Sequence, residues 1–310
     1  MTRSPLPRSR FSVNFGTLFT EIPLPERLAA AKACGFEVVE FQFPYDHTIE
    51  ELKAALDTSG MRLNNLNTPR GDTSRDEWGH AGIPGREADF RRYFAQAVDY
   101  ATALGAPLIH VMSGVVAPGQ HEAGLTTYIA NIREAARSVA DRGLTLLLEP
   151  LNRYDRPGNL VSRSDDIVAL IDEIGEPNVK LMFDFYHIQV MEGDLLRRYE
   201  RHMPHIGHVQ IANAPLRLAP DKGEINYPAI FEAIAASPYQ GPVGLEYKPT
   251  GRTEDDFGWM EAFGVELGHS GAFSLPLGKG GSGERFHNGR TFTRAPCHMG
   301  SCPYAGKPGS

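Results

Sequence analysis

The sequence predicts an α/β protein in which eight parallel strands and the helices between them close into one (β/α)₈ barrel. Short aliphatic segments alternate with longer segments of helical spacing, and eight such pairs follow one another between residues 11 and 264. This alternation is typical of βαβ units and a parallel sheet. No Gly-x-Gly-x-x-Gly motif follows the first predicted strand, which favours a closed barrel over an open nucleotide-binding sheet.

The predicted strands are short, and several are apolar at consecutive positions, as expected of strands that are buried on both faces. They span Phe11 to Phe15, Phe36 to Phe41, Met61 to Asn67, Pro107 to Ser113, Leu144 to Glu149, Val179 to Asp184, His205 to Ile211 and Val243 to Tyr247. Pro25 is expected in the first turn of one helix, and glycines are expected just after the ends of others. These glycines are Gly35, Gly60, Gly105, Gly143 and Gly175.

Both ends of the chain are expected to lie outside the barrel. The first ten residues, MTRSPLPRSR, are predicted to form a flexible N-terminal extension. Residues 265–310 contain 10 Gly, 5 Ser and 4 Pro. Such a segment buries too little apolar surface to offset the entropy lost on ordering it. We therefore predict a catalytic domain over residues 11–264, followed by a disordered C-terminal tail over residues 265–310.

The charge balance and the hydropathy pattern argue against two classes of partner. With 31 basic and 38 acidic residues the formal net charge is −7, which repels a nucleic-acid backbone. The longest apolar runs are far shorter than the roughly 20 residues of a membrane-spanning helix. No export signal is readable, and Cys34, Cys297 and Cys302 are too few for a disulfide framework. We expect a soluble, cytoplasmic protein, and the sequence leaves a homo-oligomer open.

Four consecutive predicted strands carry an oxygen-donor side chain near their carboxyl ends. These residues are Glu149, Asp184, Gln210 and Glu246, and their separations of 35, 26 and 36 residues each correspond to about one βα unit. In a (β/α)₈ barrel these strand ends form the active-site face. A single carboxylate there is commonly solvated or caps a helix, but burying Glu149 and Glu246 without a partner would be costly. The coincidence predicts one divalent metal ion, Mg²⁺ or Mn²⁺, which prefer oxygen ligands.

Three further residues are weaker candidates. Asn67 ends a predicted strand, where it either hydrogen-bonds a substrate or serves as a turn residue. Lys248 follows the last strand and either binds a carboxylate or is solvated. His208 lies two residues before Gln210 on the same face of its strand, and it is expected in the barrel interior or beside the ligands rather than among them.

Nine short motifs occur in order along the chain: FSVNFGTLF, GFEVVEFQFPY, NTPRGD, IPGRE, LEPLN, DFYHIQVMEGDL, GHVQIA, GEINYP and GLEYKP. Each motif is weak alone, but the ordered set resembles the hydroxypyruvate isomerase family, within the xylose isomerase-like TIM barrel superfamily. The resemblance runs from about Arg10 to Met260. It also implies a TIM barrel fold, in agreement with the alternation of strands and helices.

The resemblance implies specific roles for several residues. Glu149, Asp184, Gln210 and Glu246 match the metal ligands of the family, and Glu149 and Glu246 also match its two catalytic glutamates. His187 and Arg217 match residues that contact substrate. Family members often read Asn-Pro-His-Arg-Gly-Glu after strand seven, whereas this chain reads Ala-Pro-Leu-Arg-Leu-Ala over residues 214–219. This departure places the substrate in doubt more than the type of reaction.

The implied activity is a metal-assisted aldose–ketose isomerisation that interconverts hydroxypyruvate and tartronate semialdehyde through an enediolate. The substrate would be a small hydroxy-carbonyl acid, and which glutamate acts as the base stays open. A 2-oxotetronate isomerase or a ketose 3-epimerase would use the same site. An endonuclease IV-like phosphodiesterase would need more metal ions and histidines, and a non-catalytic sugar-binding barrel would bind without turnover.

Overall fold

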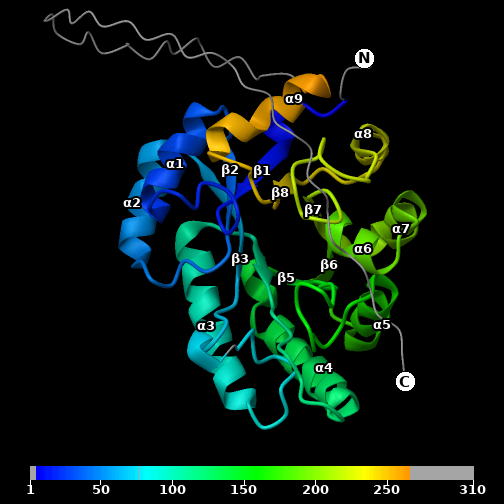
Figure 1. Ribbon diagram of the computed structural model, residues 1–310. Coiled ribbons are helices and arrows are strands. Elements are labelled where there is room, and N and C mark those ends of the chain that lie inside the picture. The colour runs from blue at the N-terminus through cyan, green and yellow to red at the C-terminus, as the bar shows by residue number, and fades with distance from the viewer. Residues whose placement is uncertain (1–4, 76, 266–310) are drawn as a thin grey trace, which may run out of the picture. The chain divides into compact units, whose positions relative to one another are not determined.

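The computed structural model describes residues 5–75 and 77–265, apart from the Thr73 side chain, and shows a closed parallel barrel with strands in the order β1 to β8 (Figure 1). The barrel closes where Phe11 of β1 pairs with Val243 of β8. The fold class and all eight predicted strands are confirmed. The strands are β1 Phe11–Asn14, β2 Val38–Phe41, β3 Arg62–Asn67, β4 Leu108–His110, β5 Thr145–Leu148, β6 Val179–Asp184, β7 Ile206–Ile211 and β8 Val243–Leu245.

Helices connect successive strands and surround the barrel (Figure 1). Two helices, α6 and α7, lie between β6 and β7, and α9 follows β8. The helices are α1 Leu24–Ala33, α2 Ile49–Ser59, α3 Glu87–Leu104, α4 His121–Ser138, α5 Ser164–Ile174, α6 Phe185–Met191, α7 Leu195–His202, α8 Tyr227–Ala236 and α9 Gly258–Ala262.

Helix α2 illustrates how local sequence sets these boundaries. The hydroxyl of Thr48 accepts a hydrogen bond from the Glu51 backbone, and the Glu51 carboxylate accepts one from the Thr48 backbone. This capping box satisfies two of the free N–H groups at the helix start. Gly60 ends the helix in the left-handed conformation at φ 63°, as predicted from its position. Leu52 and Leu56 face the core between these ends.

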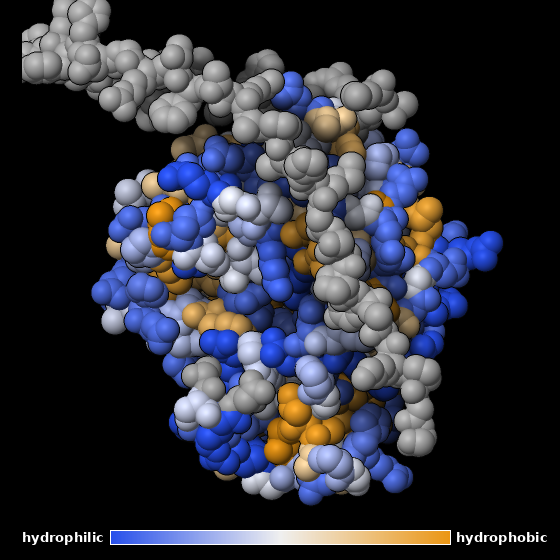
Figure 2. Space-filling view, in the orientation of Figure 1, coloured by the Kyte–Doolittle hydropathy of each residue, from blue (hydrophilic) through white to orange (hydrophobic). Residues whose placement is uncertain are grey.

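The face of the barrel that Figure 2 shows is mainly polar. In the space-filling view polar residues cover most of the visible face, with smaller apolar areas between them (Figure 2). Among the helices of the described ranges, none is both long enough and apolar enough to cross a membrane.

The chain before β1 packs against the barrel. Residues Arg8–Arg10 form a short 3₁₀ helix, and Leu6 is buried in the core. The Arg10 guanidinium donates hydrogen bonds to the carbonyls of Tyr239 and Gly241, at 3.0 and 3.1 Å. The prediction of a flexible extension is therefore wrong for residues 5–10, because one leucine and the arginines anchor them. Val265, the first residue of the predicted tail, is also buried in the core, so that prediction is wrong for this residue. Residues 1–4 and the rest of the predicted tail, residues 266–310, lie outside the described residues.

We expect Leu6→Ala to lower the free energy of unfolding by about 2 kcal/mol, because it removes buried methyl groups and leaves a cavity. Chemical denaturation measures this change. Leu196→Ala is the matched control, since Leu196 is 44% exposed, and it should change stability by less than about 0.5 kcal/mol. Equal unfolding curves for the wild type and Leu6→Ala would show that residues 5–10 do not stabilise the barrel.

Candidate active site

A cavity of about 670 Å³ opens beside the carboxyl ends of the strands and contains most of the predicted site. Its lining includes five of the predicted residues, namely Asn67, Glu149, His187, Arg217 and Glu246. Asp184 and Gln210 are buried at the ends of β6 and β7. Lys248 is exposed and does not line this cavity. Of the two alternatives predicted for Lys248, the structure therefore favours a solvated side chain over contact with the substrate.

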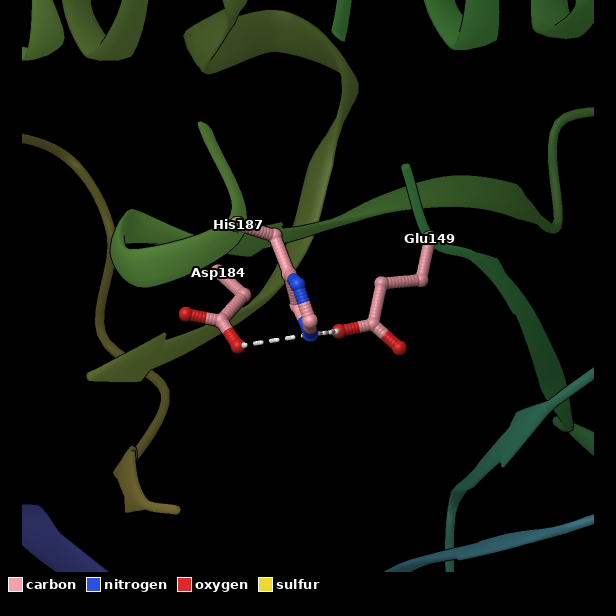
Figure 3. A group of neighbouring side chains, drawn as sticks. All are labelled: Glu149, Asp184 and His187. Atoms are coloured by element: carbon pink, nitrogen blue, oxygen red, sulfur yellow. Dashed lines mark ion pairs between the residues drawn. The ribbon is translucent and has the colours of Figure 1, made fainter. Parts of the chain in front are cut away.

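Glu149, Asp184 and His187 form the centre of the site (Figure 3). His187 Nε2 lies 3.7 Å from Glu149 Oε1 and 3.6 Å from Asp184 Oδ2. One atom from each side chain falls within 4.8 Å of the others. The residues come from the end of β5, the end of β6 and the first turn of α6, so the parallel topology brings them together.

Several buried atoms at this centre lack a hydrogen-bond partner among the described residues. They are Glu149 Oε1, Asp184 Oδ2, His187 Nε2 and Gln210 Oε1. The other oxygen of Asp184 accepts a hydrogen bond from the Tyr186 backbone at 2.8 Å, which fixes the direction of Oδ2. Leaving buried oxygens unpaired is costly, and a divalent cation is a suitable partner for three of them. The residues therefore fit a metal ion.

The hydrogen bonds of His187 determine which of its nitrogens carries the proton. The backbone N–H of Asn152, which can only donate, points at His187 Nδ1 at 3.2 Å, and the Asn152 amide lies 2.7 Å from the same atom. Burial lowers the pKa of His187 well below its usual value, so the ring is neutral. Its single proton is then on Nε2. His187 therefore offers a donor toward the two carboxylates, not a lone pair for a metal.

Burial and mutual repulsion raise the pKa values of three carboxyl groups at the site. Burial, followed by the nearby charges of Glu246 and Asp184, raises the pKa of Glu149 well above its usual value. Burial raises the pKa of Glu246 to about 8, although Arg217 opposes the shift. Burial also raises the pKa of Asp184. Such a cluster stays together at neutral pH by holding protons or a cation.

With a chelator present, we expect stability to fall by about 1 kcal/mol as the pH rises from about 7 to 8.5, from Glu246 alone. Folded Glu246, with a pKa of about 8, still holds a proton that an unfolded glutamate, with a pKa of 4.5, has released. Unfolding then releases a proton and becomes more favourable at higher pH. This range lies above the ordinary histidine pKa of 6.5, so the lowered pKa values of His110 and His187 do not contribute.

Denaturant titrations at several pH values measure this effect. Glu246→Gln, which cannot titrate, is the control and should reduce the slope. Stability that rises over this range in the wild type would contradict the raised pKa of Glu246.

Arg217 neutralises part of this negative charge. Its Nη2 lies 2.7 Å from Glu246 Oε1 and 3.8 Å from Asp184 Oδ2, and its Nε donates to the Glu246 carbonyl at 3.1 Å. The Arg217 backbone has a positive φ of 59°, which is unfavourable for residues other than glycine. The loop after β7 therefore holds Arg217 against the carboxylates despite backbone strain.

Other residues of the site were not predicted from the sequence. Gln42 donates a hydrogen bond to Glu246 Oε1 at 2.6 Å, and His110 Nε2 lies 3.6 Å from Glu149 Oε2. Glu40 is fully buried inside the barrel and contacts Gln210. Glu40 and Gln42 could have been found from the sequence, because both are polar residues within or next to an apolar strand. The prediction that His208 lies in the barrel interior is confirmed.

The outer wall of the cavity carries arginines stacked on aromatic rings. The Arg70 guanidinium lies 4.4 Å from the ring centre of Phe43 and 4.8 Å from that of Trp78. Arg156 lies 3.2 Å from the Trp78 ring centre. These four residues line the same cavity as Glu149. Cation–π contacts of this kind help to hold a guanidinium in place.

Known proteins share this architecture. Residues 28–263 match the profile of the xylose isomerase-like TIM barrel. The chain belongs to the xylose isomerase-like TIM barrel family. A 2-oxo-tetronate isomerase of Cupriavidus necator is 42% identical over 255 residues, which are 82% of this chain and 98% of that protein.

Two further relatives of the xylose isomerase-like barrel support this assignment. A hydroxypyruvate isomerase of Escherichia coli is also 42% identical over 255 residues, which are 82% of this chain and 99% of that protein. A crystal structure from Brucella melitensis described as an AP endonuclease, family 2, has a TM-score of 0.80 and 39% identity. It covers 82% of this chain and 99% of its own.

Proposed function

We propose that this protein is a metal-dependent isomerase of a small hydroxy-carbonyl acid, with hydroxypyruvate as its substrate. The observation that carries the proposal is the group of unpaired oxygens of Glu149, Asp184 and Gln210 beside Glu246. 2-Oxotetronate is the second candidate substrate, because the relatives named for the two activities are equally similar to this chain at 42% identity.

The residues that would hold the cation are Glu149, Asp184, Gln210 and Glu246, and Mg²⁺ or Mn²⁺ suits their oxygen atoms. When bound, the metal supplies Lewis-acid polarisation of the substrate's carbonyl and hydroxyl oxygens. Three carboxylates around a divalent ion leave a net charge of about −1, which Arg217 offsets from 2.7 Å away.

Glu149 and Glu246 are the proposed proton-transferring groups. A base removes a proton from C3 of hydroxypyruvate, and a double bond forms between C2 and C3. An acid then returns a proton to C2, the C2 oxygen gains a proton, and the C3 hydroxyl loses one to become the aldehyde of tartronate semialdehyde. The two glutamates follow β5 and β8, so they reach the cavity from different sides.

The remaining residues orient the substrate. The Nε2–H of His187 is placed to donate a hydrogen bond to a substrate oxygen, and the Asn67 side chain lines the same cavity. The lining also contains four arginines, namely Arg27, Arg70, Arg156 and Arg217. The carboxylates of Asp46, Glu149, Asp155 and Glu246 line the same cavity, and Asp184 lies behind them. With the proposed divalent cation bound, positive charge exceeds negative charge, and this balance favours an anionic substrate over a neutral ketose. It therefore supports a hydroxy acid isomerase over a ketose 3-epimerase.

The test is a turnover assay after chelation, with and without added Mn²⁺ or Mg²⁺. Hydroxypyruvate, 2-oxotetronate and a six-carbon ketose are compared at equal concentrations. We expect metal-dependent turnover of an acid and the highest kcat/KM on hydroxypyruvate. Full activity in the presence of the chelator would contradict the proposed metal dependence. Turnover of the ketose alone would contradict the proposal that the substrate is a hydroxy acid.

A further inference from the structure

A fully buried carboxylate, Glu40, lies inside the barrel next to the proposed metal site. It receives hydrogen bonds from four side chains: Ser12, Asn14 at 3.2 Å, His208 at 2.9 Å and Gln210 at 2.9 Å. Two of these donors face each oxygen of Glu40, namely Ser12 and His208 at Oε1 and Asn14 and Gln210 at Oε2. Because both oxygens accept hydrogen bonds, Glu40 serves only as an acceptor for its neighbours.

This acceptor determines the orientation of the Gln210 amide. An amide has one donor end and one acceptor end, and its neighbours decide which end faces which way. Glu40 takes the Nε2 end at 2.9 Å, so Oε1 points away from it. Gln210 Oε1 is buried and has no hydrogen-bond partner among the described residues. The orientation thus leaves an oxygen available for the cation.

Gly244 provides the space for this pair. It lies on β8, directly opposite Gln210 in the strand pairing. A Cβ atom on Gly244 would lie 2.4 Å from Glu40 Oε1 and 2.8 Å from Gln210 Cγ. Both distances are shorter than real Cβ contacts, so a side chain here would displace Glu40 or Gln210. The barrel therefore has a gap at Gly244 that the two side chains fill.

We propose that Glu40 is a positioning residue of the metal site, which holds Gln210 so that its amide oxygen, and not its nitrogen, faces the cation. The inference rests on the metal of the proposed function and adds a residue to that site. An amide nitrogen has no lone pair suited to a hard cation, so a Gln210 amide in the reversed orientation would not coordinate it.

The test measures Mn²⁺ affinity by calorimetry on the full chain after chelation. Glu40→Gln removes the acceptor-only group, and we expect it to weaken binding by about 10- to 100-fold, as loss of a partner behind a metal ligand does. Ser12→Ala is the matched control, because it removes a different donor to the same carboxylate. It should keep the affinity within about threefold of the wild type.

A reciprocal exchange separates orientation from charge. In the Glu40→Gln, Gln210→Glu double variant the amide donates to the carboxylate, and a carboxylate oxygen again faces the cation at unchanged net charge. We expect the double variant to bind Mn²⁺ at least about tenfold more tightly than Glu40→Gln does. Gly244→Ala displaces the same pair by contact and should weaken Mn²⁺ binding by about tenfold or more. Circular dichroism shows whether Glu40→Gln folds, and if it does not, Gly244→Ala tests the same inference.

Three results would overturn the inference: a folded Glu40→Gln variant with wild-type affinity, an equal loss in Ser12→Ala, or no recovery in the double variant. If the wild type binds no Mn²⁺, this inference and the proposed metal site fail together. A wild type that binds Mn²⁺ but isomerises no hydroxy acid would overturn the proposed function alone.

Discussion

Glu149→Gln and Glu246→Gln are each expected to lower kcat by at least about 100-fold, because general acid or base catalysis contributes about 10² to 10⁴ in rate. Glutamine keeps an oxygen donor for the cation but cannot take up or return the substrate proton. The measurement is kcat at saturating Mn²⁺, with the metal concentration raised until the rate no longer changes. Wild-type turnover in heavy water should also place deuterium on the product carbon.

Asp184→Asn is the matched control for these variants. Asp184 lies beside Glu149 and shares the proposed cation, but it has no part in proton transfer. Its amide variant should need more metal yet approach the wild-type kcat once metal is saturating. If a glutamine variant keeps kcat within about tenfold of the wild type, that glutamate serves only as a ligand and the two-base mechanism is wrong.

Strand periodicity predicted most of the barrel and the centre of its site. Runs such as Leu144 to Leu148 are apolar at nearly every position because both faces of a parallel strand are covered. The closed order β1 to β8 then places all the strand ends on one side of the barrel. Glu149, Asp184 and Glu246 could therefore be grouped without knowing any side-chain contact.

Features that depend on distant contacts or on loops were not predicted. Glu40 meets Gln210 across 170 residues of sequence, and only the closed barrel brings them together. The sequence left open whether Lys248, which follows the last strand, binds the substrate's carboxylate or is solvated. Strand β8 ends at Leu245, and Lys248, three residues further on, is exposed. Leu6 was missed because a single buried leucine between prolines gives no periodic signal.

The wall of the cavity could not be read from the sequence for a similar reason. Arg70 and Trp78 come from the loop between β3 and α3, and Arg156 comes from the loop between β5 and α5. Loops have no repeating pattern that fixes which side chains meet. The resemblance to a family singled out Arg217, whereas the other three arginines in the cavity lining were found only in the structure.

Arg217→Ala is expected to lower kcat/KM for hydroxypyruvate by about 10- to 100-fold more than for dihydroxyacetone, in which an uncharged hydroxymethyl group replaces the carboxylate. A hydrogen bond to a charged group contributes about 1.5 to 3 kcal/mol, which is a factor of this size. Arg217 lines the cavity, and a guanidinium has five N–H donors, more than its two contacts with Glu246 use. The ratio of the two kcat/KM values is the measurement, since it cancels any loss that is common to both substrates.

Arg217→Lys and Arg70→Ala distinguish the shape of the group from the charge of the cavity. Lysine keeps the charge but loses the planar fork that matches a carboxylate, so Arg217→Lys should recover only part of the preference for the acid. Arg70 lies over Phe43 and Trp78 on the same cavity wall. Its loss should lower the preference less than the loss of Arg217, because Arg217 lies 2.7 Å from Glu246 and Arg70 belongs to the outer wall. An unchanged ratio in Arg217→Ala, together with a large change in Arg70→Ala, would assign the substrate carboxylate to the stacked arginine instead.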